Sequence, residues 1–347
     1  MDMLTLEERL KLLAELGEYI KTGMDEAADA VIQRAYHENK WFTPEFIRQS
    51  LDALANQMLD MEALSEWADH YQIKPMKAEP KHIGIVMAGN IPLVGFHDWL
   101  CVFVAGHYAR VKLSEKDRLL LPFLVAKMGE WEKESWAYTH FTAEGETLKQ
   151  VDAVIATGSN NSARLFESYF GKYPNIIRKN RNGVAVLMGD ETEADFIQLG
   201  KDIFTYFGLG CRNVSKLYVP KNYDFKPLLE ALHQYQDVIH HDKYKNNYDY
   251  NYTLYLLNQM PHHTSGCLLF REDESLNSRI ASVHYSEYES LDGLKSELSN
   301  RSEEIQCLVG ALDVPGVTTI PFGESQTPGL RDYADGVDVM DFLNKLN

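Results

Sequence analysis

The segment from His82 to Pro92 reads HIGIVMAGNIP, and the predicted fold is built outward from it. Its run from Ile83 to Ala88 is apolar and rich in β-branched residues, and Gly89 then permits a tight turn, so we expect a buried strand and its exit. Asn90 follows at the carboxyl end of this strand, where open α/β sheets bind ligands. Its amide is able to donate a hydrogen bond, which makes Asn90 a candidate site residue. A turn asparagine that bonds its own backbone is the alternative interpretation.

Similar apolar runs recur at Ala109 to Leu113, Val151 to Ala156 and Val184 to Met188. The segments between them, such as Leu119 to Trp131 and Ser162 to Phe170, mix polar and apolar faces as crossover helices do. This alternation of strands and helices predicts an α/β fold with a parallel sheet and βαβ connections.

The first 75 residues are predicted to be helical because apolar residues recur there at helical spacing. Thr5 with Glu8 forms a plausible capping box, and Thr43 followed by Pro44 has the chemistry of a helix start. The prolines near position 80 mark a linker, after which the sheet begins.

Beyond Gly210 the pattern indicates a second α/β lobe. Val214 to Val219 is predicted to be a strand and Lys226 to Val238 a helix, and further strands are predicted at Gly266 to Phe270 and Gln306 to Ala311. The region from His240 to Tyr255 is rich in Tyr, Asn and His without clear periodicity, so we expect an irregular segment there.

The composition is that of a globular protein: of 347 residues, 45% are hydrophobic and 24% are charged. Lys and Arg number 34 against 51 Asp and Glu, a net charge of −17, which argues against a general binder of nucleic acid or of anionic membranes. No window approaches the roughly 18 consecutive apolar residues of a membrane span, and charges interrupt the first residues, so neither a span nor a signal peptide is expected.

The cysteines are scattered at Cys101, Cys211, Cys267 and Cys307, with no disulfide framework and no zinc-binding pair. We therefore expect no metal site and a reducing, cytoplasmic location. Cys211 stands apart because it follows two glycines in the segment FTYFGLGCRN, residues 204–213, and directly precedes a predicted strand. Backbone N–H groups in such a turn make it a candidate nucleophile, with a core thiol as the alternative; the other three lie in apolar runs typical of the core.

Two more loops carry candidate site residues. The second strand ends in Val111-Lys112-Leu113-Ser114-Glu115, where a lysine is able to reach a ribose or a phosphate unless it is simply solvated. The third strand ends in Thr157-Gly158-Ser159 at the start of a predicted helix, a place that suits a phosphate, although a plain helix cap explains it equally well.

A basic cluster stands out in this acidic chain: Arg164, Lys172, Arg178, Lys179 and Arg181. It suits the phosphates of CoA or NADPH, with a solvated surface as the alternative.

In order and approximate spacing, the stretches around Asn90, Lys112 to Glu115, Thr157 to Ser159 and Gly208 to Cys211 resemble the aldehyde dehydrogenase superfamily. There they supply an oxyanion-hole Asn, a lysine for the cofactor ribose, a pyrophosphate-binding turn and the catalytic Cys. Within the superfamily, the short length, residues 207–215 and the ending YADGVD at 333–338 are similar to fatty acyl-CoA reductases of the LuxC type.

The resemblance implies a Rossmann-type nucleotide-binding domain, a second α/β catalytic domain and a helical N-terminal region. We place the helical region at residues 1–75, packed on the nucleotide-binding domain at 76–205, with the catalytic domain at 206–322 and a C-terminal tail at 323–347. Catalysis is assigned to Cys211 and Asn90, and cofactor binding to Lys112, Ser114, Glu115, Thr157, Gly158 and Ser159.

One departure from the family is informative. Hydrolytic aldehyde dehydrogenases carry a glutamate that activates water, before the strand that precedes the cysteine. The matching segment here, Ile177 to Gly183, holds no carboxylate, although Asp190 and Glu191 lie beyond the following strand. Loss of this base favours a thioester that is exchanged with a thiol over one that is hydrolysed.

The implied activity is reduction of a fatty acyl-CoA, or of an acyl-carrier-protein thioester, to the fatty aldehyde through an acyl-cysteine intermediate. We expect NADPH as the reductant. NADH is the alternative, because Glu115 would favour an unphosphorylated ribose if it contacts the adenosine as in the family. A homo-oligomer is also implied. Oxidation of a free aldehyde and a non-catalytic cofactor- or acyl-carrier-binding protein are the alternative functions.

Overall fold

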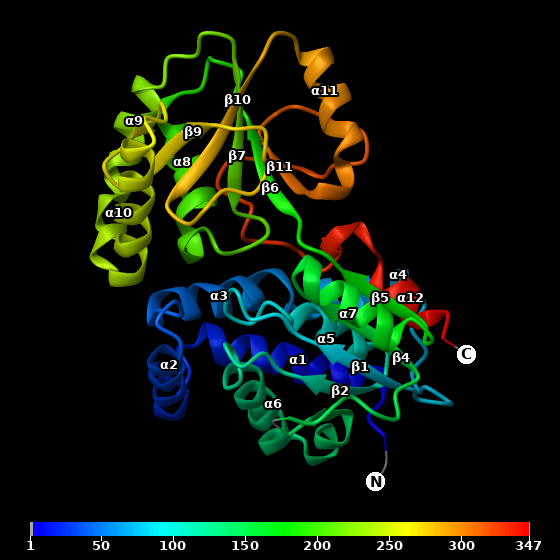
Figure 1. The fold of residues 1–347 in the computed structure, drawn as a ribbon. Coiled ribbons are helices and arrows are strands. Elements are labelled where there is room, and N and C mark those ends of the chain that lie inside the picture. The colour runs from blue at the N-terminus through cyan, green and yellow to red at the C-terminus, as the bar shows by residue number, and fades with distance from the viewer. Residues whose placement is uncertain (1–2, 144, 347) are drawn as a thin grey trace. The chain divides into compact units, whose positions relative to one another are not determined.

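A computed structural model describes residues 3–143 and 145–346 (Figure 1). The chain divides into two units, Met1–Asn180 with Thr327–Asn347, and Arg181–Gln326. Each holds one sheet, parallel in the first unit and mainly parallel in the second, with helices around it, so the predicted α/β fold with a helical N-terminal region is confirmed. Within the described residues, no helix is long and apolar enough to cross a membrane.

The first unit is built on a five-stranded parallel sheet in the order β3-β2-β1-β4-β5. The chain passes from β1 to one side and later returns to pair β4 with the other side of β1, so the strand order reverses there. Its strands are β1 (His82–Val86), β2 (Tyr108–Lys112), β3 (Thr139–Phe141), β4 (Ala153–Thr157) and β5 (Asn175–Arg178). Open α/β sheets bind ligands at such a reversal, outside the carboxyl ends of the strands.

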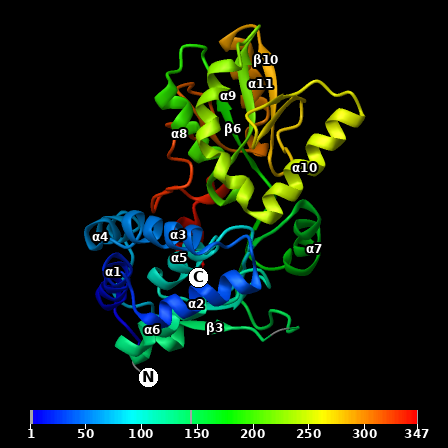
Figure 2. The ribbon, with the colours of Figure 1, turned by 90° about the vertical axis from the view of Figure 1, so that its left-hand side faces the viewer.

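Helices before, between and after these strands complete the first unit. They are α1 (Leu6–Lys21), α2 (Glu26–Glu38), α3 (Pro44–Gln57), α4 (Met61–His70), α5 (Phe96–Val104), α6 (Leu120–Trp131), α7 (Asn160–Phe170) and α12 (Val339–Asn344), with the 3₁₀ turns η1 (Lys133–Tyr138) and η5 (Ala334–Gly336). Figure 2 shows α1 to α4 gathered beside α5 and α6.

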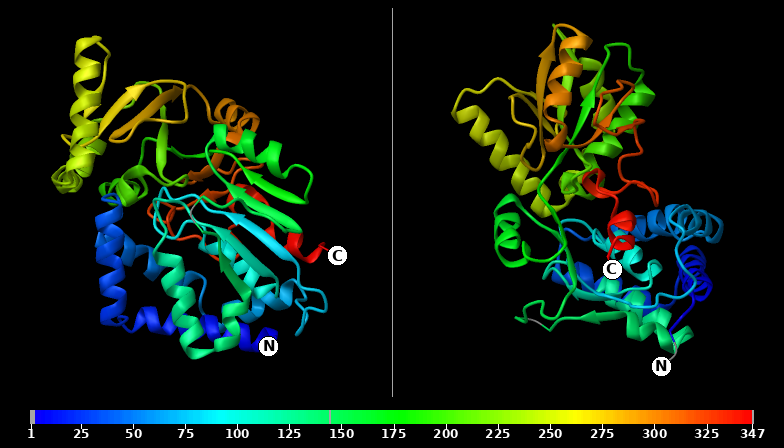
Figure 3. Two further views of the ribbon diagram at one scale, coloured as in Figure 1. Left: turned by 60° about the horizontal axis from the view of Figure 1, so that its bottom comes forward. Right: turned by 90° about the vertical axis from the view of Figure 1, so that its right-hand side faces the viewer.

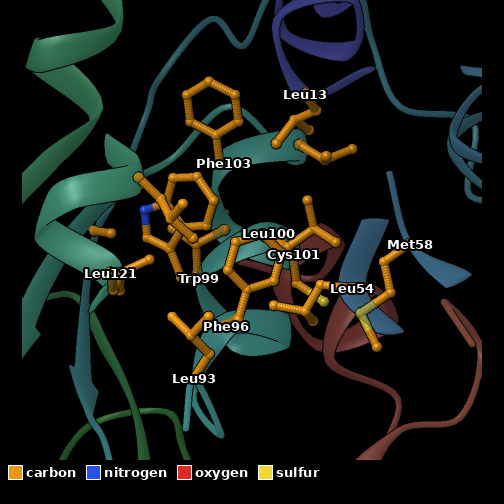
Figure 4. Packing of buried hydrophobic residues seen from close by; sticks show 14 of the residues in the cluster. Leu13, Leu54, Met58, Leu93, Phe96, Trp99, Leu100, Cys101, Phe103 and Leu121 are labelled. Carbon is orange, nitrogen blue, oxygen red and sulfur yellow. The ribbon is translucent and has the colours of Figure 1, made fainter. Parts of the chain in front are cut away.

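The N-terminal helices share one core with the first sheet. Helix α5 is buried along almost its whole length, and Leu13 of α1 and Leu54 of α3 belong to the same apolar cluster as Trp99 and Phe103 of α5 (Figure 4). The Trp99 indole donates to Thr139 Oγ1 at 2.8 Å, so its one polar atom is satisfied inside the core. An apolar helix of this kind is stable only when it is covered on every side, which is what the N-terminal helices achieve.

The predicted helix starts are confirmed at α1 and α3. Thr5 and Glu8 form a reciprocal capping box, and Thr43 accepts from the Phe46 N–H with Pro44 in the first turn. These caps satisfy backbone N–H groups that would otherwise lack a partner.

The end of the chain, shown in red in Figure 3, belongs to the first unit. The buried His107 ring forms two hydrogen bonds: its Nδ1 accepts from the Lys81 N–H at 2.9 Å, and its Nε2 lies 3.3 Å from the Leu343 carbonyl oxygen. The second contact links α12 to the sheet. Trp67 Nε1 donates to the Tyr333 hydroxyl at 2.9 Å. Residues 327–346 are therefore an integral part of the first unit.

The second unit holds a seven-stranded sheet in the order β12-β11-β6-β7-β10-β9-β8, parallel except for β8. Its strands are β6 (Asn182–Val186), β7 (Val214–Pro220), β8 (His263–Thr264), β9 (Leu269–Glu272), β10 (Ser282–Tyr288), β11 (Ile305–Val309) and β12 (Thr319–Ile320). Its helices are α8 (Glu193–Phe204), η2 (Thr205–Gly208), α9 (Lys226–Leu232), η3 (His233–His240), α10 (Asp242–Leu257), α11 (Leu291–Asn300) and η4 (Ser302–Glu304). Helices α8 to α10 lie on one side of the sheet and α11 on the other (Figure 1).

The apolar run at Val184 to Met188 does not continue the first sheet. Strand β6 pairs with β7 and β11 in the second sheet, and the second unit begins at Arg181. The boundary drawn from the sequence at residue 205 therefore falls inside this unit. A buried parallel strand has the same apolar sequence pattern in either sheet, so its own residues do not reveal which strands it pairs with.

The prediction of an irregular segment at His240 to Tyr255 was wrong, because α10 covers most of it. The His241 ring accepts from the Tyr244 N–H at the start of this helix. Only Tyr244, Asn251 and Tyr255 are buried along it, so a narrow stripe of polar and aromatic residues replaces the apolar periodicity of an ordinary helix.

Candidate functional site

The three loops singled out in the first unit meet at one edge of its sheet. Strand β1 pairs in parallel with β2 on one side and with β4 on the other. The residues at and just after the ends of these strands therefore lie at the carboxyl edge, around the reversal in strand order. They are Asn90, Lys112 to Glu115 and Thr157 to Ser159. The structure brings together all the residues assigned to a cofactor site from the sequence, and Asn90 lies with them.

The loop that carries Asn90 runs against the loop after β2. A Cβ atom added to Gly89 would lie 2.4 Å from Ser114 Oγ and 2.7 Å from its Cβ, so only glycine allows this approach. Leu93 has a left-handed backbone (φ 57°), and its N–H donates to Asp117 Oδ2 at 2.7 Å. Asp117 thus joins the two loops and holds the Asn90 turn in place.

The Asp117 carboxyl group is largely shielded from solvent. Its Oδ1 atom is buried without a hydrogen-bond partner, and burial raises the pKa of Asp117 to about 6 even though the N–H groups of Leu93 and Leu120 lower it. A carboxyl group kept in such a place contributes to loop geometry at some expense of stability.

Helix α7 begins at the turn after β4. Ser159 is its N-cap and accepts from the Ser162 N–H at 3.2 Å, while a Cβ on Gly158 would lie 2.8 Å from Ser162 Cβ. The cap interpretation is therefore correct for the Ser159 hydroxyl. It leaves the helix N-terminus, with its dipole, at the edge where the other two loops lie.

Arg178 does not belong to a solvated basic cluster. It is 4% exposed at the end of β5 and forms a bidentate ion pair with Asp98 of α5, at 2.5 and 2.9 Å, with a further contact to Thr157 Oγ1 at 3.3 Å. Lys179 pairs with Glu167 at 3.2 Å. Two members of the expected cluster thus lie in different pairs, Arg178 in a buried one and Lys179 in one at the surface, and the buried pair supports the turn after β4.

Cys211 lies on a strained turn of the second unit, between α8 and β7. Tyr206, Phe207 and Gly208 take left-handed conformations in succession, with φ of 54°, 57° and 74°. For the two aromatic residues this costs roughly 1–2 kcal/mol each. Their side chains are buried, and the Phe207 ring packs 4.3 Å from that of His241, so packing holds the strained backbone in place.

The Asn213 side chain joins both ends of this turn. Its Oδ1 accepts from the Gly210 N–H at 2.7 Å, and its Nδ2 donates to the carbonyls of Asp202 and Thr205, each at 2.9 Å. The Asp202 carboxylate is buried in turn and accepts from the N–H groups of residues 323 and 325 at 2.6 and 3.0 Å. Burial raises the pKa of Asp202, and these N–H groups partly offset that rise.

The other cysteines are core residues, as predicted. Cys101, Cys267 and Cys307 are fully buried, whereas Cys211 is half-buried, and none of the four is part of a disulfide. Burial raises the pKa of Cys307 to about 12 and that of Cys101 well above its usual value. Of the four, Cys211 alone combines partial exposure with a place outside the strands and helices. Among the described residues, no group of His, Cys, Asp and Glu is arranged to hold a metal ion.

Solved structures of aldehyde dehydrogenases are similar to this chain throughout most of its length. Aldehyde dehydrogenase 21 from Physcomitrella patens, in complex with succinate, has a TM-score of 0.68 at 12% identity, over 98% of this chain and 85% of that one. Two further structures are also similar, each with a TM-score of 0.63 at 14% identity over 91% of this chain. One is betaine aldehyde dehydrogenase from Staphylococcus aureus with NAD+, of which 75% is covered. The other is succinic semialdehyde dehydrogenase from Streptococcus pyogenes with NADP+, of which 81% is covered. The chain has the aldehyde dehydrogenase fold. No protein-family model and no curated protein sequence matches it.

Within this fold the sheet topology decides which carboxylates lie near Cys211. Strands β6 and β7 are parallel, with Gly183 opposite Val214, so the segment before β6 and the Cys211 turn share the amino edge of the sheet. A Cβ on Gly183 would lie 2.6 Å from the carbonyl oxygens of residues 212 and 213. Glu191 follows the other end of β6, where it accepts from the N–H groups of residues 188 and 189.

The five residues of β6 separate these two edges by about 16 Å. Asp190 and Glu191 are therefore not placed to replace the base that Ile177 to Gly183 lacks. The buried Asp202 lies closer to the turn, but both its oxygens are engaged by backbone N–H groups.

Four residues that shape the candidate site were not singled out from the sequence: Asp98, Asp117, Asp202 and Asn213. Each is a buried or half-buried polar residue whose partner lies on another segment of the chain. The one available signal was a polar residue inside or beside an apolar run, as at Asp98 in residues 96–104.

The raised pKa of Asp117 predicts a pH-dependent stability. Aspartate in an unfolded chain titrates near 4, so between about pH 4 and 6 the folded state binds more protons and loses stability as pH rises. Asp117→Asn removes this titration. Urea unfolding from pH 4 to 7 should therefore show the wild type losing on the order of 2 kcal/mol relative to the variant. A difference between the two proteins that does not change with pH would contradict this environment for Asp117.

Proposed function

We propose that the protein is an NAD(P)H-dependent acyl-thioester reductase that converts an acyl-CoA to the aldehyde through an acyl-Cys211 intermediate. The observation that carries the proposal is the half-buried Cys211 on its braced turn, in a chain with the aldehyde dehydrogenase fold and no base before β6. The finer likeness, to fatty acyl-CoA reductases of the LuxC type, rests on the sequence motifs at residues 207–215 and 333–338.

In the proposed reaction the Cys211 thiolate attacks the thioester carbonyl, and the CoA thiolate leaves with the electron pair of the broken C–S bond. The resemblance to the aldehyde dehydrogenase superfamily assigns the Asn90 amide, together with a backbone N–H, the role of donor to the oxyanion that forms. When bound, a reduced nicotinamide would supply the hydride that reduces the acyl carbon. Cys211 is released as a thiolate when the aldehyde departs, so the enzyme returns to its starting state.

In this proposal the cofactor binds at the carboxyl edge of the first sheet. The N-terminus of α7, with Thr157, Gly158 and Ser159, suits a pyrophosphate. Lys112, Ser114 and Glu115 on the next loop would bind the adenosine ribose, and the close approach at Gly89 leaves the two loops side by side. We propose NADPH, with NADH as the alternative, since similar folds are known with either NAD+ or NADP+.

Two features support reduction over hydrolysis. The segment before β6 holds no carboxylate, and Glu191 lies at the opposite edge of the second sheet. Without a base, water attacks the acyl-enzyme slowly, while a thiolate or a hydride needs no such activation. The same proposal covers three further points. An acyl carrier protein is the alternative acyl donor, the protein forms a homo-oligomer, and it is located in the cytoplasm.

The first test concerns the nucleophile. Incubation with a radiolabelled long-chain acyl-CoA should give a hydroxylamine-sensitive adduct that is absent from Cys211→Ala and retained in Cys101→Ala, the matched loss of a buried thiol. Equal labelling of Cys211→Ala and wild type would refute the assignment, and no labelling of either would favour a non-catalytic binding protein.

The second test concerns the oxyanion. Asn90→Ala should lower turnover by roughly 10²–10³, as loss of one oxyanion donor does, while leaving the cofactor Kd within a few-fold of wild type. Steady-state aldehyde formation and nucleotide titration measure the two effects. Unchanged turnover in a folded variant would return Asn90 to the role of a turn residue.

The third test concerns the fate of the acyl group. Without cofactor, the acyl-enzyme should hydrolyse slowly and transfer readily to added thiols; with reduced cofactor, aldehyde should become the main product. Carboxylate, thioester and aldehyde are followed together in one assay. Cys211-dependent carboxylate that appears as fast as aldehyde would replace the reductase with the hydrolytic alternative.

A further inference from the structure

The Asn213 side chain links the end of α8 to the residue before Cys211. It is 2% exposed, and its amide uses both N–H donors and its oxygen on backbone groups. Two of these bonds hold the end of α8, and the third holds the N–H of Gly210, the residue before Cys211. One side chain therefore fixes the distance between the helix end and the nucleophile.

The pattern of donors and acceptors demands an amide at this position. The carbonyls of Asp202 and Thr205 need donors, while the Gly210 N–H needs an acceptor, and they surround the same buried group. A carboxylate of the same shape would face two carbonyl oxygens without a proton to offer. An apolar side chain would leave three backbone groups without this partner.

The turn needs such support because its backbone does not favour this conformation by itself. Three successive left-handed residues lie between the helix end and Gly210. The Asp202 carboxylate extends the support further, since it binds the backbone of residues 323 and 325 while its own carbonyl accepts from Asn213. Titratable groups surround the turn: Arg212, Cys211 and Asp202 interact with Cys307, Lys201 and Tyr235 interact with Asp202, and the His241 ring packs on Phe207.

We propose that Asn213 is a positioning residue that sets the orientation, and through it the reactivity, of Cys211. The inference rests on the proposed role of Cys211 as the nucleophile. Asn213 touches neither substrate nor cofactor in this account. It acts by keeping the Gly210 peptide, and the thiol that follows it, in the geometry that acyl transfer requires.

The test compares Asn213→Asp with a matched control, Asn251→Asp. Asn251 is equally buried in the same unit, and its Nδ2 donates to the Ile280 carbonyl at 2.8 Å. Both variants lose donors to backbone carbonyls, so both should lower the melting temperature. The distinguishing readout is the rate of Cys211 alkylation by iodoacetamide between pH 5.5 and 9.5, quantified by peptide mass spectrometry.

Asn213→Asp should displace the alkylation profile to higher pH and slow the reaction at pH 7 about tenfold, as a displacement of one pH unit does for a thiolate nucleophile. Asn251→Asp should leave the profile unchanged. If Asn213→Asp does not fold, Asn213→Ser is measured in the same way. Its hydroxyl oxygen is an acceptor, but it lacks the two N–H donors of the amide. A profile identical to wild type in the folded Asn213 variant would overturn the inference.

Alkylation requires no acyl chemistry, so the two proposals fail separately. Wild-type protein that takes up no acyl label, together with a displaced profile in Asn213→Asp, would refute the reductase and retain the positioning role. Normal acyl labelling of wild type, together with an unchanged alkylation profile in Asn213→Asp, would retain the reductase and refute the positioning role.

Discussion

The hydrogen bonds that pair β1 in parallel with β2 and β4 are the constraint on which the candidate cofactor site depends. Parallel strands end at a common edge, so the residues that follow them share a neighbourhood although up to 70 positions separate them in the sequence. Around that edge, glycine at position 89 permits a close approach, Asp117 ties two loops together, and the Asp98–Arg178 pair supports the third. Polar groups buried beneath the loops thus hold the shape that the strands define.

The second sheet brings the segments around Cys211, the proposed nucleophile, to a common edge in the same way, but there it is the amino edge. Cys211 precedes β7, so its neighbours are the residues that enter strands, and the carboxylates that follow β6 are a strand's length away. A single topological fact therefore bears on which chemistry is available to an acyl-cysteine. It favours attack on the acyl group by a thiolate or a hydride, because neither requires a base at that edge.

Elements built from continuous apolar runs were predictable from the sequence, and those built from buried polar residues were not. The strands β1, β2, β4 and β7 and the cap of α1 follow from local patterns. Strand β10 was missed because Ser282, His284 and Ser286 are buried along it and bonded to side chains or backbone of other segments. Such residues read as exposed until their partners are known.

The site shows the same division. Asn90 and Cys211 were found from glycine turns beside strands, which are local signals. Asp117 and Asn213, which brace the loops that carry them, were not found, because a buried hydrogen bond to a backbone group leaves no spacing pattern. The placement of β6 in the second sheet was likewise invisible, since pairing is decided by the whole sheet.

The central claim is that hydride passes directly to an acyl group held on Cys211. A single turnover with acyl-CoA and nicotinamide cofactor deuterated at the transferring position, followed by mass spectrometry of the aldehyde, tests it most directly. The account predicts one deuterium at the aldehyde carbon and none when Cys211 is replaced by Ala. Aldehyde without deuterium, or deuterated aldehyde formed at the wild-type rate by Cys211→Ala, would contradict it.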